Sequence, residues 1–318
     1  MSHTVDGVAE CVRSLLTSEK GKERIERFNE LVARVEKNIP TLSKKIRPSL
    51  HRRAGIQFYI NASTAQATSR RHGVRMSVRV HGCECGTVSV DLDGVSAFAP
   101  SNRRLFDRCG YDKVRGLKWG HPAVARFIKG CVDAVRKGEV NTGRPEASVE
   151  AELIARMKSE SGGWWRLQQP VCLAGMPLQI PLPITASGPD PTIGDGHIDV
   201  LGRRGRGGKG LRIYEVKAPS APVENALDQA VAYTVALKFL LTQPDIGSRQ
   251  PWWSLIGFSK RPEHTPRLEA FACVADNCRN RMRVEEACKG LALSNRENIV
   301  VDAVFYTHDK SGRLLLAR

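Results

Sequence analysis

Acidic and basic side chains alternate along two short apolar segments near the middle of the chain, at spacings that suit a metal-dependent site. Glu215 and Lys217 are two residues apart, and an extended strand projects such residues from one face. Asp199 has the same setting in the preceding segment, and pairing of the two strands would bring it beside Glu215. Two carboxylates that close repel each other unless a divalent cation or a shared proton neutralises them, and hard oxygen ligands suit Mg²⁺ or Mn²⁺.

A cation held in this way polarises a phosphodiester, lowers the pKa of a bound water and stabilises the leaving oxygen. A neighbouring lysine, here Lys217, orients the water and offsets the charge that develops at phosphorus. Glu215 and Lys217 belong to the only acid-x-Lys triplet in the chain. The pattern favours phosphodiester hydrolysis, and a surface salt bridge along one strand is the alternative interpretation.

Positive charge is concentrated in the first part of this chain of 318 residues. The 49 Lys and Arg exceed the 33 Asp and Glu by 16, and residues 1–140 contain 26 of the bases and 14 of the acids. No acid occurs within residues 41–83, a stretch that includes Arg70, Arg71 and Arg75. Such a surplus attracts a polyanion, usually nucleic acid phosphate. We expect these three arginines to bind nucleic acid, with a solvated basic face as the alternative.

Cysteine content and hydropathy indicate the compartment. No stretch reaches the roughly 18 apolar residues that span a bilayer, and the N-terminal segment lacks a signal-peptide pattern. The nine cysteines, an odd number, fit free thiols in a reducing compartment. We therefore expect a cytoplasmic protein with no membrane partner. Two groups of residues are alternative zinc ligands, although neither has paired CxxC spacing: His81 with Cys83 and Cys85, and Cys273 with Cys278 and Cys288.

The first 140 residues read as a basic α+β domain. Helical spacing of apolar residues predicts one or two amphipathic helices over residues 5–35. Alternating segments separated by turn residues predict a small antiparallel sheet over 55–100. A helix over 122–137 follows, and residues 138–143 are the candidate linker. We expect this domain, residues 1–140, to bind nucleic acid or to sense a trigger.

Residues 141–318 read as a second, α/β domain in which helices and strands alternate. The strands at 197–203 and 211–217 are joined by an exposed loop rich in glycine and arginine. The remaining predicted elements are helices over 146–160, 223–241 and 284–293, and strands over 168–174, 177–184, 253–259, 267–275 and 298–306.

Three short motifs together resemble a known family of nucleases. They are I-D-V at 198–200, E-V-K at 215–217 and, on the following helix, Q-A-V-A-Y at 229–233. This set is similar to the PD-(D/E)XK nuclease superfamily, and the glutamine and tyrosine resemble the QxxxY element of its RecB-like branch. The resemblance covers about residues 145–240. It implies a restriction-endonuclease-like core, with a central mixed sheet flanked by helices.

The resemblance also implies roles for individual residues. Asp199 and Glu215 would be metal ligands, with the carbonyl of Val216 as a third, and Lys217 would be the catalytic lysine. Two further residues would support the site and contact the DNA backbone, although ordinary packing within a helix is the alternative for both: Gln229 and Tyr233.

The family pattern further expects a glutamate on the helix before the first strand, and this helix offers Glu146, Glu150 and Glu152. At about 100° per residue, Glu150 lies on the apolar face turned to the sheet, whereas Glu152 points away. We therefore predict Glu150 as the metal ligand, with Glu152 as the alternative. His197 shares a face with Asp199 and is either an additional ligand or a hydrogen-bonding neighbour.

These observations predict a Mg²⁺-dependent DNA nuclease, either endo- or exonucleolytic. We expect it to act in antiviral defence against foreign DNA or in DNA processing. The alternative hypothesis is a catalytically inactive nuclease-fold protein that binds nucleic acid. RNA stays open as the substrate because the chemistry at phosphorus is shared. Cutting both strands of a duplex would need two sites, so a homodimer is a further expectation. Four loop residues suit phosphate contacts, unless the loop is merely solvated: Arg203, Arg204, Arg206 and Lys209.

Overall fold

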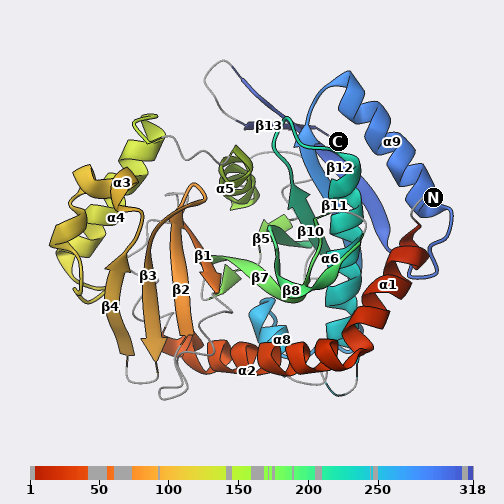
Figure 1. The fold of residues 1–318 in the computed structure, drawn as a ribbon, viewed down its shortest axis with the longest axis horizontal. Coiled ribbons are helices and arrows are strands. Elements are labelled where there is room, and N and C mark those ends of the chain that lie inside the picture. The colour runs from red at the N-terminus through yellow and green to blue at the C-terminus, as the bar shows by residue number, and fades with distance from the viewer. Residues whose placement is uncertain are drawn as a thin grey trace.

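The protein has an α/β fold in which two sheets are packed among helices (Figure 1). The computed structural model describes residues 4–41, 56–60, 74–91, 94–140, 145–158, 168–170, 172–173, 176–187, 190–204, 210–243, 245, 250–309 and 314–317. Among the helices of these residues, none combines the length and the apolar character that crossing a membrane requires.

Two amphipathic helices open the chain, α1 (Val5–Thr17) and α2 (Glu19–Thr41), which confirms the helical prediction for this region. Ser18 has an extended backbone that ends α1, and its hydroxyl accepts the Gly21 N–H at 3.1 Å. A Cβ atom at Gly21 would lie 2.1 Å from the Leu15 carbonyl oxygen. The sharp bend between the helices therefore requires glycine at this position.

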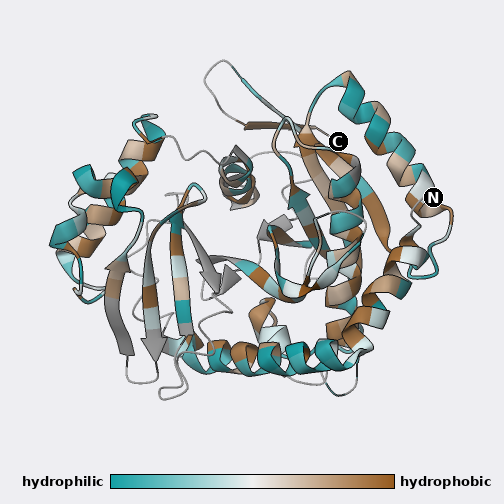
Figure 2. Ribbon diagram, in the orientation of Figure 1, coloured by the Kyte–Doolittle hydropathy of each residue, from teal (hydrophilic) through white to brown (hydrophobic). Residues whose placement is uncertain are grey.

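Four antiparallel strands follow and confirm the sheet that was expected over residues 55–100. Along the second strand, hydrophilic residues alternate with buried apolar ones, as Figure 2 shows. The bounds of the strands are β1 (Ile56–Ile60), β2 (Val74–Val80), β3 (Cys83–Asp91) and β4 (Gly94–Pro100).

The turn between β2 and β3 consists of His81 and Gly82, both with positive φ angles, of 45° and 76°. A Cβ atom at Gly82 would lie 1.8 Å from the Cβ of Ala147 on helix α5 (Pro145–Lys158). The turn thus packs directly on α5, and glycine is required both for the backbone angle and for this close approach.

Three later strands extend the same sheet, so it takes strands from both sides of residue 140. Strand β7 (Met176–Thr185) pairs in parallel with β1 and antiparallel with β6 (Cys172–Leu173) and β8 (Thr192–Ile198). The strand order is β4-β3-β2-β1-β7-β6, with β8 on β7. Helix α2 contacts β2, β3, β7 and β8 and runs along the lower ends of β2 and β3 in Figure 1. The boundary at residue 140 stays a prediction.

Two helices pack beside β4, α3 (Arg103–Phe106) and α4 (Pro122–Arg136) (Figure 1). The His121 imidazole accepts the Ala123 N–H at 3.1 Å and caps α4. This helix confirms the prediction over residues 122–137.

The second sheet is mixed and has the strand order β13-β12-β11-β10-β9-β5. Its three central strands, β10, β11 and β12, are parallel, and the outer pairs are antiparallel. Its bounds are β5 (Gln168–Pro170), β9 (Val200–Arg204), β10 (Gly210–Val216), β11 (Arg267–Ala275), β12 (Val300–His308) and β13 (Leu314–Ala317).

Helices cover both faces of the second sheet. Helix α5 packs on one face in a separate apolar cluster. Helices α6 (Glu224–Thr242) and α9 (Cys278–Ala292) pack on the other. The helix prediction over 223–241 is confirmed, whereas α9 begins six residues before the predicted start, because the Asn277 side chain caps it by accepting the Asn280 N–H at 2.8 Å.

The predicted strand over residues 253–259 is wrong, because the chain there forms the short helix α8 (Gln250–Leu255) and then a turn. Trp252 and Trp253 are both buried, and the Trp252 indole donates to the Asn29 side chain of α2 at 2.7 Å. A short apolar segment can form either a buried strand or a buried helix, because periodicity alone does not distinguish the two.

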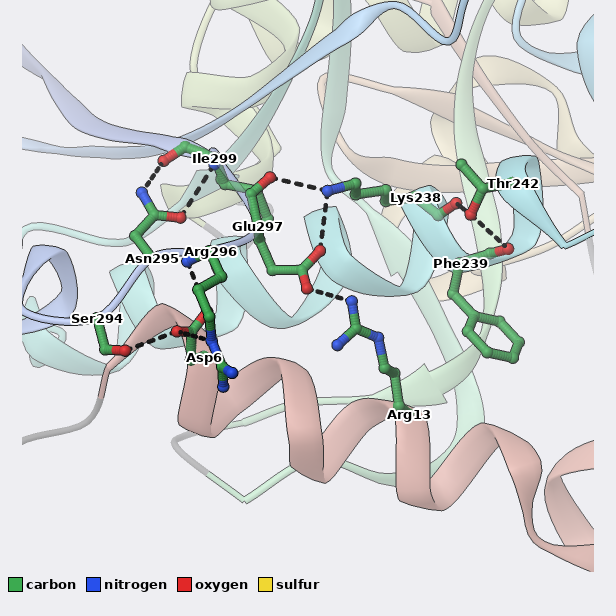
Figure 3. A network of polar contacts seen from close by, with 10 residues as sticks. All are labelled: Asp6, Arg13, Lys238, Phe239, Thr242, Ser294, Asn295, Arg296, Glu297 and Ile299. Carbon is green, nitrogen blue, oxygen red and sulfur yellow. Dashed lines mark hydrogen bonds and ion pairs between the residues drawn. The ribbon is translucent and has the colours of Figure 1, made fainter.

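A polar network joins α1 to the second sheet (Figure 3). Arg13 of α1 and Lys238 of α6 both donate to the carboxylate of Glu297, in the segment before β12. We call these three residues the Glu297 cluster. Nearby, the Asp6 carboxylate accepts from the Ser294 hydroxyl at 2.6 Å and from the Arg296 guanidinium at 2.9 Å.

Candidate functional site

Asp199 lies at the junction of the two sheets. The strand predicted over residues 197–203 is divided there, because β8 of the first sheet ends at Ile198 and β9 of the second begins at Val200. The Asp199 Oδ2 atom accepts the Val216 N–H at 2.9 Å. Asp199 itself belongs to neither strand, and its carboxylate points toward Val216, the last residue of β10.

Glu215 and Lys217 meet Asp199 at the end of β10. Tyr214 pairs with Val200, so the register places Glu215 opposite Asp199. The Lys217 ammonium donates to Glu215 Oε1 at 2.7 Å and to Gln229 Oε1 of α6 at 2.8 Å. We call Asp199, Glu215 and Lys217 the carboxylate site.

The carboxylate site has more negative than positive charge. Burial raises the pKa of Glu215 well above its ordinary value, and the charge of Asp199 raises it further, with Lys217 opposing both. Burial also raises the pKa of Asp199, although His197, the Val216 N–H and Lys217 oppose it. The buried Glu215 Oε2 atom has no hydrogen-bond donor. The positive charge of Lys217 is therefore shared by the buried Glu215 and the largely buried Asp199.

Lys217 stays protonated in this setting. Burial alone would lower its pKa, but the charges of Glu215, Asp199 and Glu146 outweigh that effect and raise the pKa. The lysine is thus a fixed cation whose side chain is 16% exposed, so it reaches the surface of the site.

A hard divalent cation fits this donor set. The two carboxylates are adjacent, and one oxygen of Glu215 is buried without a donor. Within the residues that the structure describes, no group of three or more His, Cys, Asp or Glu side chains forms a complete metal cage. Mg²⁺ commonly takes only one or two protein carboxylates and keeps several waters, so two carboxylates suffice for it.

Gln229 and Tyr233 of α6 support the carboxylate site through hydrogen bonds. They are four residues apart, and the Gln229 amide donates to the Tyr233 hydroxyl at 3.3 Å. The Tyr233 hydroxyl also accepts the Ala186 N–H at 3.2 Å, just after β7. Tyr233 is 3% exposed, so its place in the structure suits the supporting role better than a contact with DNA.

The three glutamates of α5 point to three different places. Glu146 accepts the Ala218 N–H at 3.1 Å, directly after Lys217. Glu150 is buried and accepts from the Gln179 amide of β7 at 3.0 Å. Glu152 accepts the Leu314 N–H of β13 at 2.9 Å, away from the carboxylate site.

Glu150 is linked to the first sheet through the Gln179 amide. Gln179 is next to Ile180, which pairs with Ile198 at the end of β8, one residue before Asp199. Sequence reasoning missed the nearness of Glu146 to Lys217. The signal was its spacing of four from Glu150, which puts both glutamates on one face of the helix.

His197 and Arg79 are two residues of the first sheet that lie near the carboxylate site. The His197 imidazole lies 4.0 Å from Asp199 Oδ1 and is about half exposed, with 49% of its side chain accessible. Desolvation lowers the pKa of His197, Asp199 opposes this, and Arg79 and Lys217 reinforce it. Arg79 therefore lies near enough to act on the site electrostatically, a role that the sequence did not reveal.

Two of the four loop residues expected to bind phosphate have partners within the protein. The Arg203 guanidinium lies 4.4 Å from the centre of the Phe258 ring and donates to the Gly257 carbonyl. Arg204 donates to the buried carboxylate of Glu269 at 3.0 Å. Both side chains make contacts within the protein from β9, and Arg204 remains about half exposed.

Of the other residues predicted to bind nucleic acid, the structure describes only Arg75. Arg75 is exposed on β2, where its guanidinium donates to the Thr87 hydroxyl at 3.1 Å. Four lie outside the described residues: Arg70, Arg71, Arg206 and Lys209.

The cysteines that the structure describes are free thiols. Cys83 and Cys85 are buried in the first sheet, and Cys273 is buried in β11. Their setting is that of small apolar core residues.

In comparisons with known proteins, no protein-family model, no curated protein and no solved structure matches this chain. The geometry of the carboxylate site is therefore the basis for assigning a function.

Proposed function

We propose that this protein is a metal-dependent deoxyribonuclease with its active site at Asp199, Glu215 and Lys217. The observation that supports this most directly is the pair of neighbouring carboxylates, Glu215 buried at the end of β10 and Asp199 largely buried just before β9, with a single lysine beside them. A purely structural ion pair does not need the second acid, which makes burial more costly.

We further propose that residues of the second sheet form a restriction-endonuclease-like core. An antiparallel β9–β10 pair followed by the parallel strands β11 and β12, with α5 and α6 on opposite faces, agrees with the core that the PD-(D/E)XK resemblance implies. The fold alone does not imply the activity, because a fold of this kind hosts many functions.

The residues of the site have distinct tasks in this proposal. Asp199 and Glu215 would hold Mg²⁺ or Mn²⁺, and the bound ion supplies a Lewis acid and a water of lowered pKa. The hydrogen bonds to Glu215 and Gln229 use two of the three N–H groups of the Lys217 ammonium. The third can hold the attacking water or a phosphoryl oxygen, and the fixed charge stabilises the negative charge that develops there.

Nucleic acid is the substrate that the charge of the chain favours. The surplus of 16 positive charges attracts phosphates, and Arg79 places one of these charges beside the site. Destruction of foreign DNA or processing of cellular DNA is the biological role that we propose.

A cleavage assay tests this function. Linear, circular and single-stranded DNA, and RNA, are each incubated with Mg²⁺ or Mn²⁺ and with a chelator control. We expect metal-dependent cleavage of DNA, and we expect Lys217→Ala to bind DNA like the wild type without cutting it. Lys238→Ala is the matched control, because Lys238 also pairs with a glutamate but lies in the Glu297 cluster.

Two outcomes would overturn the proposal. If no substrate is cut with either metal while Lys217→Ala and the wild type bind DNA equally, the protein is an inactive nuclease-fold binding protein. If RNA is cut and DNA is not, the chemistry stands and the assignment of DNA as the substrate is wrong.

A further inference from the structure

The chain immediately after β10 is held by hydrogen bonds although the strand has ended at Val216. The Lys217 N–H donates to the Cys273 carbonyl at 3.0 Å, which continues the contact with β11 for one residue. The Lys217 carbonyl then accepts from the Tyr306 hydroxyl at 2.8 Å. The next N–H, that of Ala218, donates to Glu146 at 3.1 Å.

The last two of these bonds hold a single peptide group from opposite sides. The carbonyl of Lys217 and the N–H of Ala218 belong to one planar unit and point in opposite directions when the bond is trans. No peptide bond of the described residues is cis. Tyr306 and Glu146 therefore fix the rotation of this peptide plane, to which the Cα of Lys217 is attached. We call this pair the peptide clamp.

The two members of the clamp come from distant parts of the fold. Tyr306 is on β12, two strands from Lys217, and is only 2% exposed. Its ring packs in the apolar cluster beneath α5, so only the hydroxyl reaches the end of β10. Burial raises the pKa of Tyr306, and Cys273 and Glu146 raise it further, so the hydroxyl keeps its proton and remains a donor.

We propose that Tyr306 and Glu146 are positioning residues that hold Lys217 against Glu215 and Gln229. The inference rests on the proposed function, in which Lys217 acts at phosphorus. The lysine side chain is long and flexible, and a small rotation at its backbone moves the ammonium out of hydrogen-bond range. Misplacement of a catalytic group by about 1 Å lowers a rate by as much as about 100-fold.

Tyr306→Phe tests the clamp because it removes only the hydroxyl. Tyr214→Phe is the matched control, since Tyr214 is a buried tyrosine of the same apolar cluster whose hydroxyl is directed to Arg212. We expect Tyr306→Phe to lower kcat for DNA cleavage about 10- to 100-fold with KM unchanged. Tyr214→Phe should leave both constants within about twofold.

Hydrogen exchange of the Ala218 amide in metal-free protein provides a readout that does not depend on cleavage. Tyr306→Phe and Glu146→Ala should each accelerate this exchange about tenfold or more, while Tyr214→Phe leaves it unchanged. Amides in the middle of β11 report global stability and should exchange alike in all variants, which separates a local opening of the clamp from unfolding.

Glu146→Gln distinguishes a hydrogen bond from a charge. The glutamine oxygen can still accept the Ala218 N–H, so this variant should restore slow exchange and most of the cleavage that Glu146→Ala removes. Equal loss of cleavage in the two variants would overturn the positioning role, because it would assign the function to the carboxylate charge itself.

The remaining outcomes are also decisive. Unchanged exchange in Tyr306→Phe, or unchanged kcat despite faster exchange, would overturn the proposal while leaving the nuclease assignment intact. If the wild type cuts no nucleic acid, the proposed function is wrong. The positioning role in catalysis is then wrong too, even if the exchange data show that Tyr306 and Glu146 hold the peptide group.

Discussion

Two clusters of acids and bases in this protein are made of similar residues but have opposite charge balance. In the Glu297 cluster, one carboxylate accepts from both Arg13 and Lys238 (Figure 3). In the carboxylate site, Lys217 serves both Asp199 and Glu215. The first cluster has an excess of positive charge and the second an excess of negative charge.

The pKa values of Glu215 and Glu297 follow this balance. Burial alone would raise the pKa of Glu297, but the hydrogen bonds from Lys238 and Arg13 outweigh burial and lower it. For Glu215, burial and Asp199 together outweigh Lys217 and raise the pKa. The negative charge of Glu297 is therefore balanced within the fold, and its ion pairs stabilise the folded state. In the carboxylate site the raised pKa of Glu215 means that its charge is not balanced by Lys217 alone, so a shared proton or, as we propose, a bound cation would balance it.

The largest expected difference between the clusters is in cleavage. Asp199→Ala or Glu215→Ala should lower cleavage about 10²- to 10³-fold or more, because either change removes a proposed ligand of the cation that stabilises the developing charge. Glu297→Ala should leave cleavage within about twofold. Equal losses of cleavage in all three variants, measured at a temperature where each is folded, would show that the two clusters do not differ in their effect on catalysis.

The next effect is on stability, where the two clusters should differ in sign. Glu297→Gln should lower the free energy of unfolding by about 1–2 kcal/mol, because charged hydrogen bonds between α1, α6 and the loop before β12 are weakened. Glu215→Gln should raise it by about 1 kcal/mol in metal-free buffer, because repulsion with Asp199 is relieved. Urea unfolding measures both, and a marked loss of stability in Glu215→Gln would contradict this interpretation.

The pH dependence of these two stability effects should also be opposite. The pKa of Glu297 is lowered by folding, so its contribution is present above its ordinary pKa of 4.5 and is lost as pH falls through the folded value. The pKa of Glu215 is raised, so the folded state loses stability as pH rises from 4.5 through the folded value.

Unfolding of each variant beside the wild type from about pH 3 to about pH 8 checks these signs. The deficit of Glu297→Gln should shrink toward low pH, and the gain of Glu215→Gln should grow toward high pH. Parallel curves for the two variants would show that folding shifts both pKa values in the same direction.

The smallest expected effect concerns the basic surface. Replacement of Arg70, Arg71 and Arg75 by Ala should weaken DNA binding and flatten its salt dependence, by about 0.9 in slope for each phosphate that the variant no longer neutralises. Arg103→Ala is a control, because Arg103 donates to Asp112 on the same half of the chain. An unchanged salt slope in the triple variant would assign these arginines to solubility instead.

The sequence predicted the parts of the site that depend on local pattern. Alternation of apolar and polar residues predicted β10, and its pairing with the preceding segment predicted that Asp199 and Glu215 are neighbours. The spacing of four on α6 placed Gln229 and Tyr233 together. These relations involve residues close in sequence or on consecutive strands, for which strand and helix periods are sufficient.

The parts that the sequence did not predict depend on contacts between distant segments. Tyr306 reaches Lys217 across 89 positions, and no period relates the two residues. The parallel pairing of β1 with β7 joins segments on either side of residue 140, and such pairing has no local signal. The prediction of Glu150, with Glu152 as the alternative, did not anticipate the contact of Glu146 with the Ala218 N–H, because helix geometry gives a face but not the neighbour that covers it.

Thermal unfolding with and without Mn²⁺ tests most directly whether the carboxylate site accepts a cation. The wild type should gain about 2.7 kcal/mol of stability at a metal concentration of about 100 times Kd, because the ion binds only the folded state. Asp199→Ala and Glu215→Gln should lose this gain, and Glu297→Gln should keep it. No stabilisation of the wild type by Mn²⁺ or Mg²⁺, or the same stabilisation in all variants, would contradict a metal site at Asp199 and Glu215.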